Sequence, residues 1–150
     1  YIPNTNHGLR NIDGEYNLKS LAAFYKAVIS DTERPSYDWY VSNDSIYLNI
    51  DHMVNADYSI KQWEIVNGET RDFRVYVAGR AWSSTDIPKS NDGQYAVKIV
   101  QPEVGYKAGL LEIIFNPESE LPFTFTTGTV VSPNTYPISE YVNENPLGTR

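Results

Sequence analysis

Short runs in which apolar and polar residues alternate fill the chain from residue 36 to residue 138. A period of two places alternate side chains on the same face of a β-strand. Turn-forming pairs such as Asn67-Gly68 separate the runs at spacings of roughly 8–16 residues, and no helical pattern lies between them. This arrangement is typical of an antiparallel β-sandwich. We therefore predict strands at residues 37–41, 46–50, 58–66, 73–78, 95–100, 110–115 and 123–131.

The first 35 residues follow a different pattern. Tyr1-Ile2 forms a short apolar stretch, which predicts the end of a strand, and Pro3 and a turn-rich segment follow it. Apolar residues then recur at intervals of three and four, which predicts an amphipathic helix over residues 16–30. Its apolar stripe comprises Leu18, Leu21, Ala22, Tyr25, Val28 and Ile29.

One strand and one helix cannot bury an apolar stripe by themselves. We therefore interpret residues 1–35 as the end of a larger α/β domain, residues 36–138 as the sandwich and residues 139–150 as a flexible tail. Because the chain begins at Tyr1 and its only methionine is Met53, we expect a processed product or a piece of something longer. The alternative is a free-standing sandwich with a helix packed across one of its faces.

Charge and composition argue against several classes of protein. Among 150 residues, 12 are Lys or Arg and 19 are Asp or Glu, giving a net charge of −7. Such a balance argues against nucleic-acid partners, because phosphate binding needs a basic patch. No apolar run is long enough for a membrane span. The chain has no cysteine, which excludes disulfides and a thiol nucleophile, and it contains no G-x-S-x-G or nucleotide-binding motif.

His7 is the candidate catalytic residue. It follows the predicted strand end and precedes the predicted helix. In α/β-hydrolases the histidine of the triad comes last in the chain, after the serine and the acid. There it accepts the serine proton and returns it to the leaving group. The alternative is an ordinary histidine in a surface turn.

Other candidate residues lie in the predicted sandwich. Asn43-Asp44-Ser45 matches the N-glycosylation sequon on a predicted hairpin turn, so Asn43 is the acceptor if the chain passes through a eukaryotic secretory route. Arg71, Asp72 and Arg74 are predicted either to dock the sandwich onto a neighbouring domain or to form an ion pair that holds a turn. Trp63 is expected to be the core tryptophan of an immunoglobulin-like third strand.

The sequence predicts no metal site and no cofactor. His7 and His52 are far apart and lie in different predicted parts of the chain. Two pairs of aspartates could meet at loop tips and bind calcium, namely Asp51 with Asp57 and Asp86 with Asp92. We favour solvated loops for both pairs, because the EF-hand spacing is absent.

Several segments, taken in order, give the chain a resemblance to the C-terminal part of the PhoPQ-activated pathogenicity-related proteins, a group that includes the autocrine proliferation repressor proteins. The resemblance extends to about residue 137. The segments that carry it are Tyr1-Ile2-Pro3-Asn4-Thr5-Asn6-His7, Ser20-Leu21-Ala22-Ala23-Phe24-Tyr25, Trp63, Arg71-Asp72-Phe73-Arg74, Trp82, Gly105-Tyr106-Lys107-Ala108, Glu112, Phe115, Pro122-Phe123-Thr124-Phe125-Thr126-Thr127 and Val130-Val131-Ser132-Pro133-Asn134-Thr135-Tyr136-Pro137.

The resemblance implies a mixed fold, in which the last strand, loop and helix of an α/β-hydrolase-like domain precede an immunoglobulin-like β-sandwich. It also implies a secreted or periplasmic protein, with His7 at the position of the hydrolase histidine. The serine and the acid would then lie upstream or on a separate chain, which would be the partner of this one. The alternative is a secreted signalling protein whose sandwich binds a receptor and whose hydrolase-like part is a non-catalytic scaffold.

Overall fold

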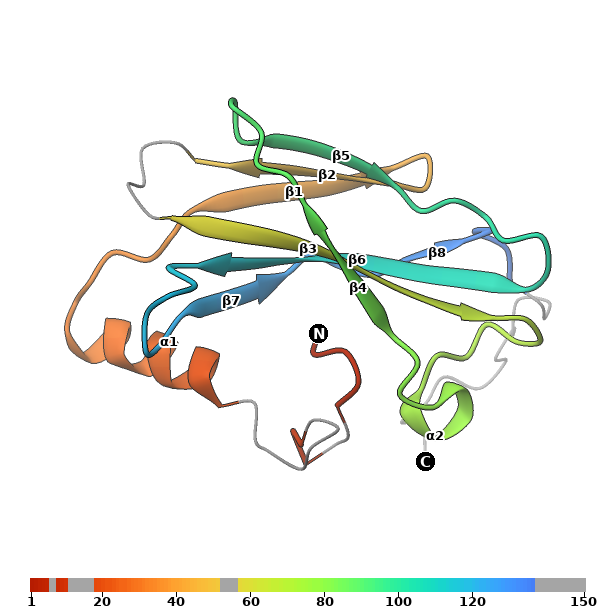
Figure 1. The fold of residues 1–150 in the computed structure, drawn as a ribbon, viewed down its shortest axis with the longest axis horizontal. Coiled ribbons are helices and arrows are strands. Elements are labelled where there is room, and N and C mark those ends of the chain that lie inside the picture. The colour runs from red at the N-terminus through yellow and green to blue at the C-terminus, as the bar shows by residue number, and fades with distance from the viewer. Residues whose placement is uncertain (6–7, 11–17, 52–56, 137–150) are drawn as a thin grey trace, which may run out of the picture.

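Two antiparallel β-sheets form the body of the molecule in the computed structural model, which describes residues 1–5, 8–10, 18–51 and 57–136 (Figure 1). The smaller sheet contains β1 (Tyr37–Ser42), β2 (Ser45–Ile50) and β5 (Gln94–Lys98) in the order β1-β2-β5. A two-residue turn at Asn43 and Asp44 joins β1 to β2, and both residues have positive φ, as tight hairpins require. The predicted hairpin is therefore confirmed.

The larger sheet contains five strands. Its order is β4-β3-β6-β7, and β8 also pairs with β6. The strands are β3 (Tyr58–Asn67), β4 (Ser83–Ile87), β6 (Tyr106–Phe115), β7 (Phe123–Thr126) and β8 (Val130–Ser132). β3 and β6 pair along their whole lengths, so they form the centre of the sheet.

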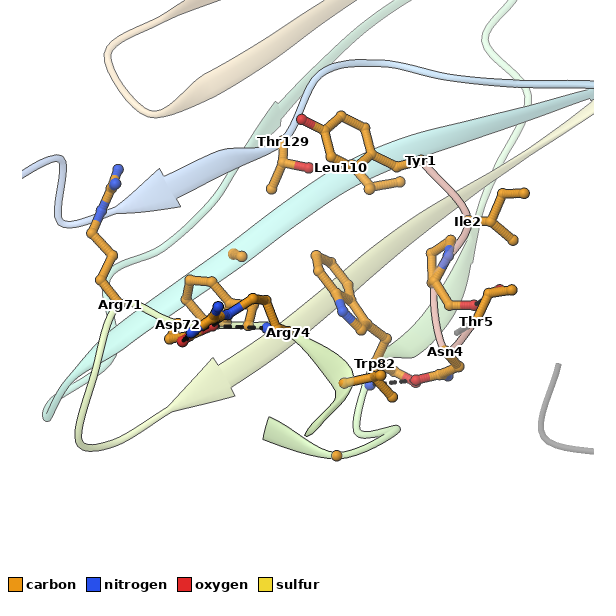
Figure 2. A pocket seen from close by; sticks show the side chains of 15 residues that line it. Tyr1, Ile2, Asn4, Thr5, Arg71, Asp72, Arg74, Trp82, Leu110 and Thr129 are labelled. Atoms are coloured by element: carbon orange, nitrogen blue, oxygen red, sulfur yellow. Dashed lines mark hydrogen bonds and ion pairs between the residues drawn. The ribbon is translucent and has the colours of Figure 1, made fainter. Parts of the chain in front are cut away.

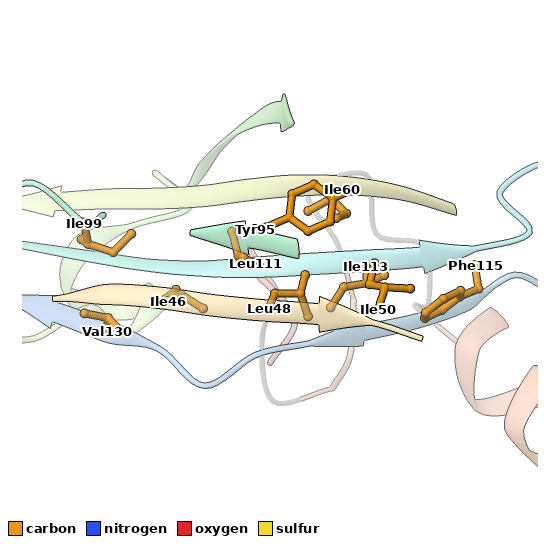
Figure 3. Close-up of a cluster of buried hydrophobic side chains, with 10 residues drawn as sticks. All are labelled: Ile46, Leu48, Ile50, Ile60, Tyr95, Ile99, Leu111, Ile113, Phe115 and Val130. Atoms are coloured by element: carbon orange, nitrogen blue, oxygen red, sulfur yellow. The ribbon is translucent and has the colours of Figure 1, made fainter. Parts of the chain in front are cut away.

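The main core lies between the two sheets (Figure 3). Side chains of β6 at every second position face it, and Leu111, Ile113 and Phe115 are all fully buried. β2 contributes the same alternation from the opposite sheet. The cluster comprises Ile46, Leu48, Ile50, Ile60, Tyr95, Ile99, Leu111, Ile113, Phe115 and Val130. The predicted β-sandwich is thus confirmed.

The outer face of the larger sheet is also covered. Ala108 and Leu110 alternate with the core residues of β6, yet they are only 0% and 1% exposed. Trp63 lies opposite Leu110 in the β3–β6 register and therefore shares this outer face. The expectation that Trp63 belongs to the main core is wrong, although its place on the third strand is right. Trp63 lies three positions after Ile60, whose side chain faces the core. Since side chains alternate along a strand, an odd separation places Trp63 on the opposite face of the sheet.

Helix α1 (Lys19–Ile29) lies against β7 on the outer side of the larger sheet (Figure 1). Only Ala23 and Ala27 of this helix are buried. The predicted apolar stripe lies on the opposite side of the helix, because its positions differ from Ala23 and Ala27 by about half a turn. Its large side chains are exposed: Leu18 44%, Leu21 61%, Tyr25 65%, Val28 59% and Ile29 65%.

Two predicted strands differ from the structure, and one strand of the structure was not predicted. Residues 73–78 do not form a strand, because Val75–Ala78 is a single helical turn, α2, in which the Arg74 carbonyl accepts hydrogen bonds from Val77 and Ala78. β4 was not predicted, since its sequence Ser-Ser-Thr-Asp-Ile carries no apolar alternation. The predicted strand at residues 123–131 is divided into β7 and β8.

Tyr1 and Ile2 form no strand. Both side chains are exposed, at 76% and 45%, so the expected strand end has no strand partner within the described residues. The predicted tail, residues 139–150, lies outside the described residues. Neither of the described helices is both long enough and apolar enough to cross a membrane.

Candidate functional site

The N-terminal segment lies across the outer face of the larger sheet, where Asn4 attaches it to the residue that precedes β4. The Asn4 side-chain Nδ2 donates to the Trp82 carbonyl at 2.8 Å, and the Trp82 N–H donates to Asn4 Oδ1 at 3.1 Å (Figure 2). The two bonds satisfy both backbone groups of Trp82. One asparagine side chain therefore pairs with Trp82 as a neighbouring strand would.

A pocket of about 440 Å³ lies between this segment and the loop that contains α2. Figure 2 shows Tyr1 and Ile2 on one side, Arg71, Asp72 and Arg74 on the other, and Leu110 on the sheet beneath. Its volume is in the range of small-molecule sites, and aromatic and polar side chains both line it. The residues that line the pocket are 1–5, 71–75, Gly79, Trp82, Ala108, Leu110 and Thr129.

The predicted docking residues lie at this pocket. Arg74 and Asp72 form a bidentate ion pair with each other, and the Arg74 N–H also donates to Asp72 Oδ1 at 3.1 Å. Hydrogen bonding from the Arg74 side chain lowers the pKa of Asp72. This ion pair holds the turn into α2, which agrees with the second of the two roles predicted for these residues. The Arg71 guanidinium stacks on the Tyr136 ring at 4.3 Å, and its Nε is buried without a hydrogen-bond partner among the described residues.

The candidate catalytic residue, His7, lies outside the described residues, and so does His52. Thr5, two positions before His7 in the sequence, lines the pocket. Asn43 lies at the exposed turn between β1 and β2, in the smaller sheet, which contributes no residue to this pocket. No group of three or more potential metal-binding side chains occurs within residues 1–5, 8–10, 18–51 and 57–136.

A second attachment joins α1 to the opposite edge of the larger sheet. Ser20 Oγ donates to the Thr124 carbonyl at 2.8 Å and accepts from the Thr124 N–H at 3.1 Å. Thr124 lies in β7, which is the last strand in the sheet order, so the hydroxyl occupies the place of a further strand.

Next to α1 lies a second, larger pocket of about 880 Å³, with Glu112 in its wall. Burial raises the pKa of Glu112, and this effect outweighs the opposing influence of the neighbouring Trp63 and Lys61 side chains. The carboxyl group projects from β6 onto the outer face, opposite Lys61 of β3. Among the described side chains that line these two pockets, burial raises the pKa of two groups, the Glu112 carboxyl and the Tyr37 phenol.

Reasoning from single motifs missed the polar residues that join the two parts of the chain. Asn4, Ser20, Trp82, Glu112 and Thr124 were not candidate site residues, because isolated Asn, Ser and Thr side chains carry no pattern of their own. All five nevertheless lie in segments that carry the family resemblance. Order along the chain was therefore the signal that could have found them.

Comparison with known proteins agrees with that resemblance. A family model described as PhoPQ-activated pathogenicity-related protein matches residues 1–74. The chain is also 24% identical over 168 residues to autocrine proliferation repressor protein A of Dictyostelium discoideum. The match covers 98% of this chain and 34% of that protein, so the chain spans about a third of its relative's length. No solved structure gives a significant match.

Proposed function

Because this chain is thus a relative of the PhoPQ-activated pathogenicity-related proteins, we propose that it is the C-terminal portion of a secreted α/β-hydrolase-like protein. In this proposal His7 is the histidine of a serine-hydrolase-type site. The serine and the acid belong to an upstream segment or to a separate chain. The curated relative is about three times as long as its matching region, which leaves room for such a domain.

The exposed apolar face of α1 is the observation that carries the proposal. Leu21, Tyr25 and Val28 are each about 60% exposed, although their spacing is that of a buried helix face. Apolar side chains gathered on one helix face normally lie against another element. In an α/β-hydrolase-like domain that element is the central sheet, which no described part of this chain supplies.

The proposed chemistry is acyl transfer from an ester or a peptide to water. The imidazole of His7 takes the proton of the serine hydroxyl as the serine oxygen attacks the carbonyl carbon. The imidazolium then returns that proton to the leaving group as the carbonyl–leaving-group bond breaks. Water repeats the sequence and releases the acid. No step requires a metal or a cofactor.

The order of the strands supports the immunoglobulin-like part of the proposal. The first, second and fifth strands form one sheet, and the fourth, third, sixth and seventh form the other in that order. This is the order of strands A-B-E and C′-C-F-G in immunoglobulin-type sandwiches, with a fourth strand added to the C-F-G sheet.

A second candidate function is that of a secreted signalling protein with a non-catalytic hydrolase-like scaffold. The name of the curated relative, an autocrine proliferation repressor, favours it. In this case the sandwich binds a receptor or another protein, and His7 has no chemical role.

Labelling with a fluorophosphonate probe distinguishes the two candidates. The longest natural form that contains this chain is treated with the probe, alongside His7→Ala and the control His52→Ala. Labelling of a serine that His7→Ala abolishes and His52→Ala retains supports the hydrolase. No labelling, or labelling that His7→Ala leaves unchanged, overturns it and favours the signalling role.

A secreted location is part of both candidates and has its own test. If the protein passes through a eukaryotic secretory route, Asn43 should carry an N-linked glycan, because its turn is exposed. Treatment with peptide-N-glycosidase should then reduce the mass of the secreted protein, and Asn43→Gln should abolish that change. Recovery of the protein in the cell fraction alone contradicts the location.

A further inference from the structure

The outer face of the smaller sheet lies on the opposite side of the sandwich from α1 and the N-terminal segment (Figure 1). Because Ile46, Leu48 and Ile50 of β2 face the core, the residues between them face outward. The registers of β1 with β2 and of β2 with β5 then place three rows of three residues on this face. The rows are Asp38, Asn49 and Gln94; Tyr40, Tyr47 and Ala96; and Ser42, Ser45 and Lys98.

The middle row contains two stacked rings. The ring centroids of Tyr40 and Tyr47 are 4.7 Å apart, and the ring planes differ by 7°. Two rings side by side in one plane could not approach so closely, so these rings lie face to face and each keeps one free face. Tyr40 belongs to the edge strand β1 and is 61% exposed. On the other side of Tyr47 the register places Ala96, whose methyl group is too small to cover a phenol ring.

Two carboxamides lie beside the uncovered ring face of Tyr47. Gln94 is two positions before Ala96 on the same face of β5, and Asn49 of β2 is directly opposite Gln94. Both residues are exposed, and neither side chain makes a hydrogen bond to another described residue. Each carboxamide therefore keeps its donors and its acceptor for a ligand.

This combination of side chains matches a carbohydrate. The C–H groups on one side of a pyranose ring carry a small positive charge, so they stack on the electron-rich face of an aromatic ring. The hydroxyl groups around the sugar ring both donate and accept hydrogen bonds, as carboxamides do. An acidic polymer is a poor match, because Asp38 and Lys98 are the only charged residues of the nine and the whole chain has a net charge of −7.

We propose that this face binds an extended neutral polysaccharide, with one hexose unit stacked on Tyr47 above Ala96 and its hydroxyl groups bonded by Asn49 and Gln94. Neighbouring strands lie about 4.8 Å apart, so a row across three strands spans about 10 Å, which is close to the length of a disaccharide. The polysaccharide leaves the exposed face of α1 free, because the two surfaces lie on opposite sides of the sandwich. Its binding does not involve His7, so it is compatible with either candidate function.

Binding is measured by isothermal titration calorimetry on the longest natural form that contains this chain. The protein is prepared without N-glycans, so that no sugar attached at Asn43 occupies the neighbouring face. The probes are three soluble neutral polysaccharides, namely a β-glucan, a galactomannan and an arabinoxylan, together with the acidic polygalacturonate. We expect at least one neutral probe to bind, and to bind more tightly than polygalacturonate.

Variants of the ring and of the carboxamides test which residues bind the probe. Tyr47→Ala should weaken the binding by about tenfold because the stacking surface is lost, whereas Tyr47→Phe keeps the ring and should bind almost as the parent does. Asn49→Ala combined with Gln94→Ala should also weaken it by about tenfold. The matched controls, Tyr76→Ala and Gln101→Ala, are at exposed positions outside this face and should leave the binding unchanged.

Ala96→Ile tests the site without removing any group that binds. A β-branched residue suits an exposed strand position, so the sheet should persist. Its larger side chain covers the free face of Tyr47 and should weaken the binding by about tenfold or more. Urea unfolding shows whether each variant is folded, and if Tyr47→Ala is not, Ala96→Ile and Tyr47→Phe decide.

Three results overturn the proposal. The first is that none of the neutral polysaccharides binds. The second is binding that Tyr47→Ala and Ala96→Ile leave unchanged, because the sugar would then lie elsewhere on the protein. The third is preferential binding of polygalacturonate. The fluorophosphonate labelling tests the hydrolase separately, so neither experiment decides the outcome of the other.

Discussion

At the scale of single residues, β6 passes close to Ile99 at Gly109. A Cβ atom added to Gly109 would lie 2.3 Å from the Ile99 Cδ1 atom, and Ile99 is fully buried. Interiors packed to crystal density accept no added methyl group without a shift of their neighbours. Glycine at this position therefore allows the two sheets to approach each other.

We expect Gly109→Ala to lower the free energy of unfolding by about 1–3 kcal/mol, as overpacking does in well-packed cores. Urea unfolding followed by tryptophan fluorescence measures the change. Ile99→Val in the same background should recover part of the loss. Gly68→Ala is the matched control, because no atom lies within 4 Å of its added Cβ. An equal loss in both variants would rule out the packing explanation.

Glu112 gives a pH-dependent prediction. Burial raises its pKa in the folded state, so the neutral form is favoured there. The contribution to stability is therefore largest below the ordinary glutamate pKa and is lost as pH rises through the raised folded value. We expect Glu112→Gln to remove this part of the pH dependence and to stabilise the protein at neutral pH.

The measurement is the urea unfolding free energy of both proteins across about pH 4 to 8. Glu120→Gln, at an exposed position, is the control and should leave the curve unchanged. A parent protein that gains stability with rising pH relative to Glu112→Gln would contradict the sign argued here.

Residues of the site were harder to predict than those of the core. Leu111, Ile113 and Phe115 could be placed by alternation alone, since a strand that alternates has one apolar face. Glu112 and Trp63 could not, because alternation says nothing about a second covered face. The N-terminal segment lies over that face from 58 or more positions away in the sequence, a contact that no local pattern reports.

At the scale of elements, strands with an apolar face were predicted well and polar ones were not. β2 and β3 begin and end within a residue of their predicted bounds. β4 is a polar edge strand that forms because β3 offers it backbone partners. The strand predicted at residues 73–78 is absent, and Val75–Ala78 forms a helical turn instead. The Asp72 carboxylate accepts a hydrogen bond from the Arg74 N–H, a local contact that competes with a strand ladder.

Two elements with similar apolar content should respond very differently to truncation. Phe115→Ala in β6 should cost about 3–5 kcal/mol of unfolding free energy, because it removes a fully buried ring from the main core. Leu21→Ala in α1 should cost less than about 1 kcal/mol in this chain, because its side chain is 61% exposed. Thermal or urea unfolding compares the two. A large loss from Leu21→Ala would mean that α1 is covered by the chain itself.

At the scale of the whole molecule, the exposed face of α1 should make the chain adhere to apolar surfaces. We expect the chain to bind a hydrophobic dye or to self-associate, and we expect Leu21→Glu with Val28→Glu to abolish both. Sedimentation velocity and dye fluorescence measure these effects. Val104→Glu, at a loop position that is 70% exposed, is the control. A dye-free monomer in the parent chain would mean that this face needs no partner.

The β-sandwich could be predicted from the sequence, whereas the way in which helix α1 packs on it could not. Alternation and turns predict strands, and strands of this spacing predict a sandwich. The helix stripe predicted a contact with an absent element, and its exposure is in keeping with that prediction. The helix attaches to the sheet on its other side, through Ser20, Ala23 and Ala27. These small side chains form no apolar periodicity from which the contact could have been predicted.

The cover that residues 1–5 place over Ala108 and Leu110 bears on how such a module can be inherited. A recombination event that joined residue 36 onward to an unrelated gene would remove residues 1–5 from the pocket that Ala108 and Leu110 line, and would remove the Asn4 side chain that bonds both backbone groups of Trp82. The segment that encodes the sandwich alone is therefore poorly suited to transfer between genes. Its shortest transferable unit begins before Asn4, so a transfer of that unit also carries His7, which lies three positions further along the sequence.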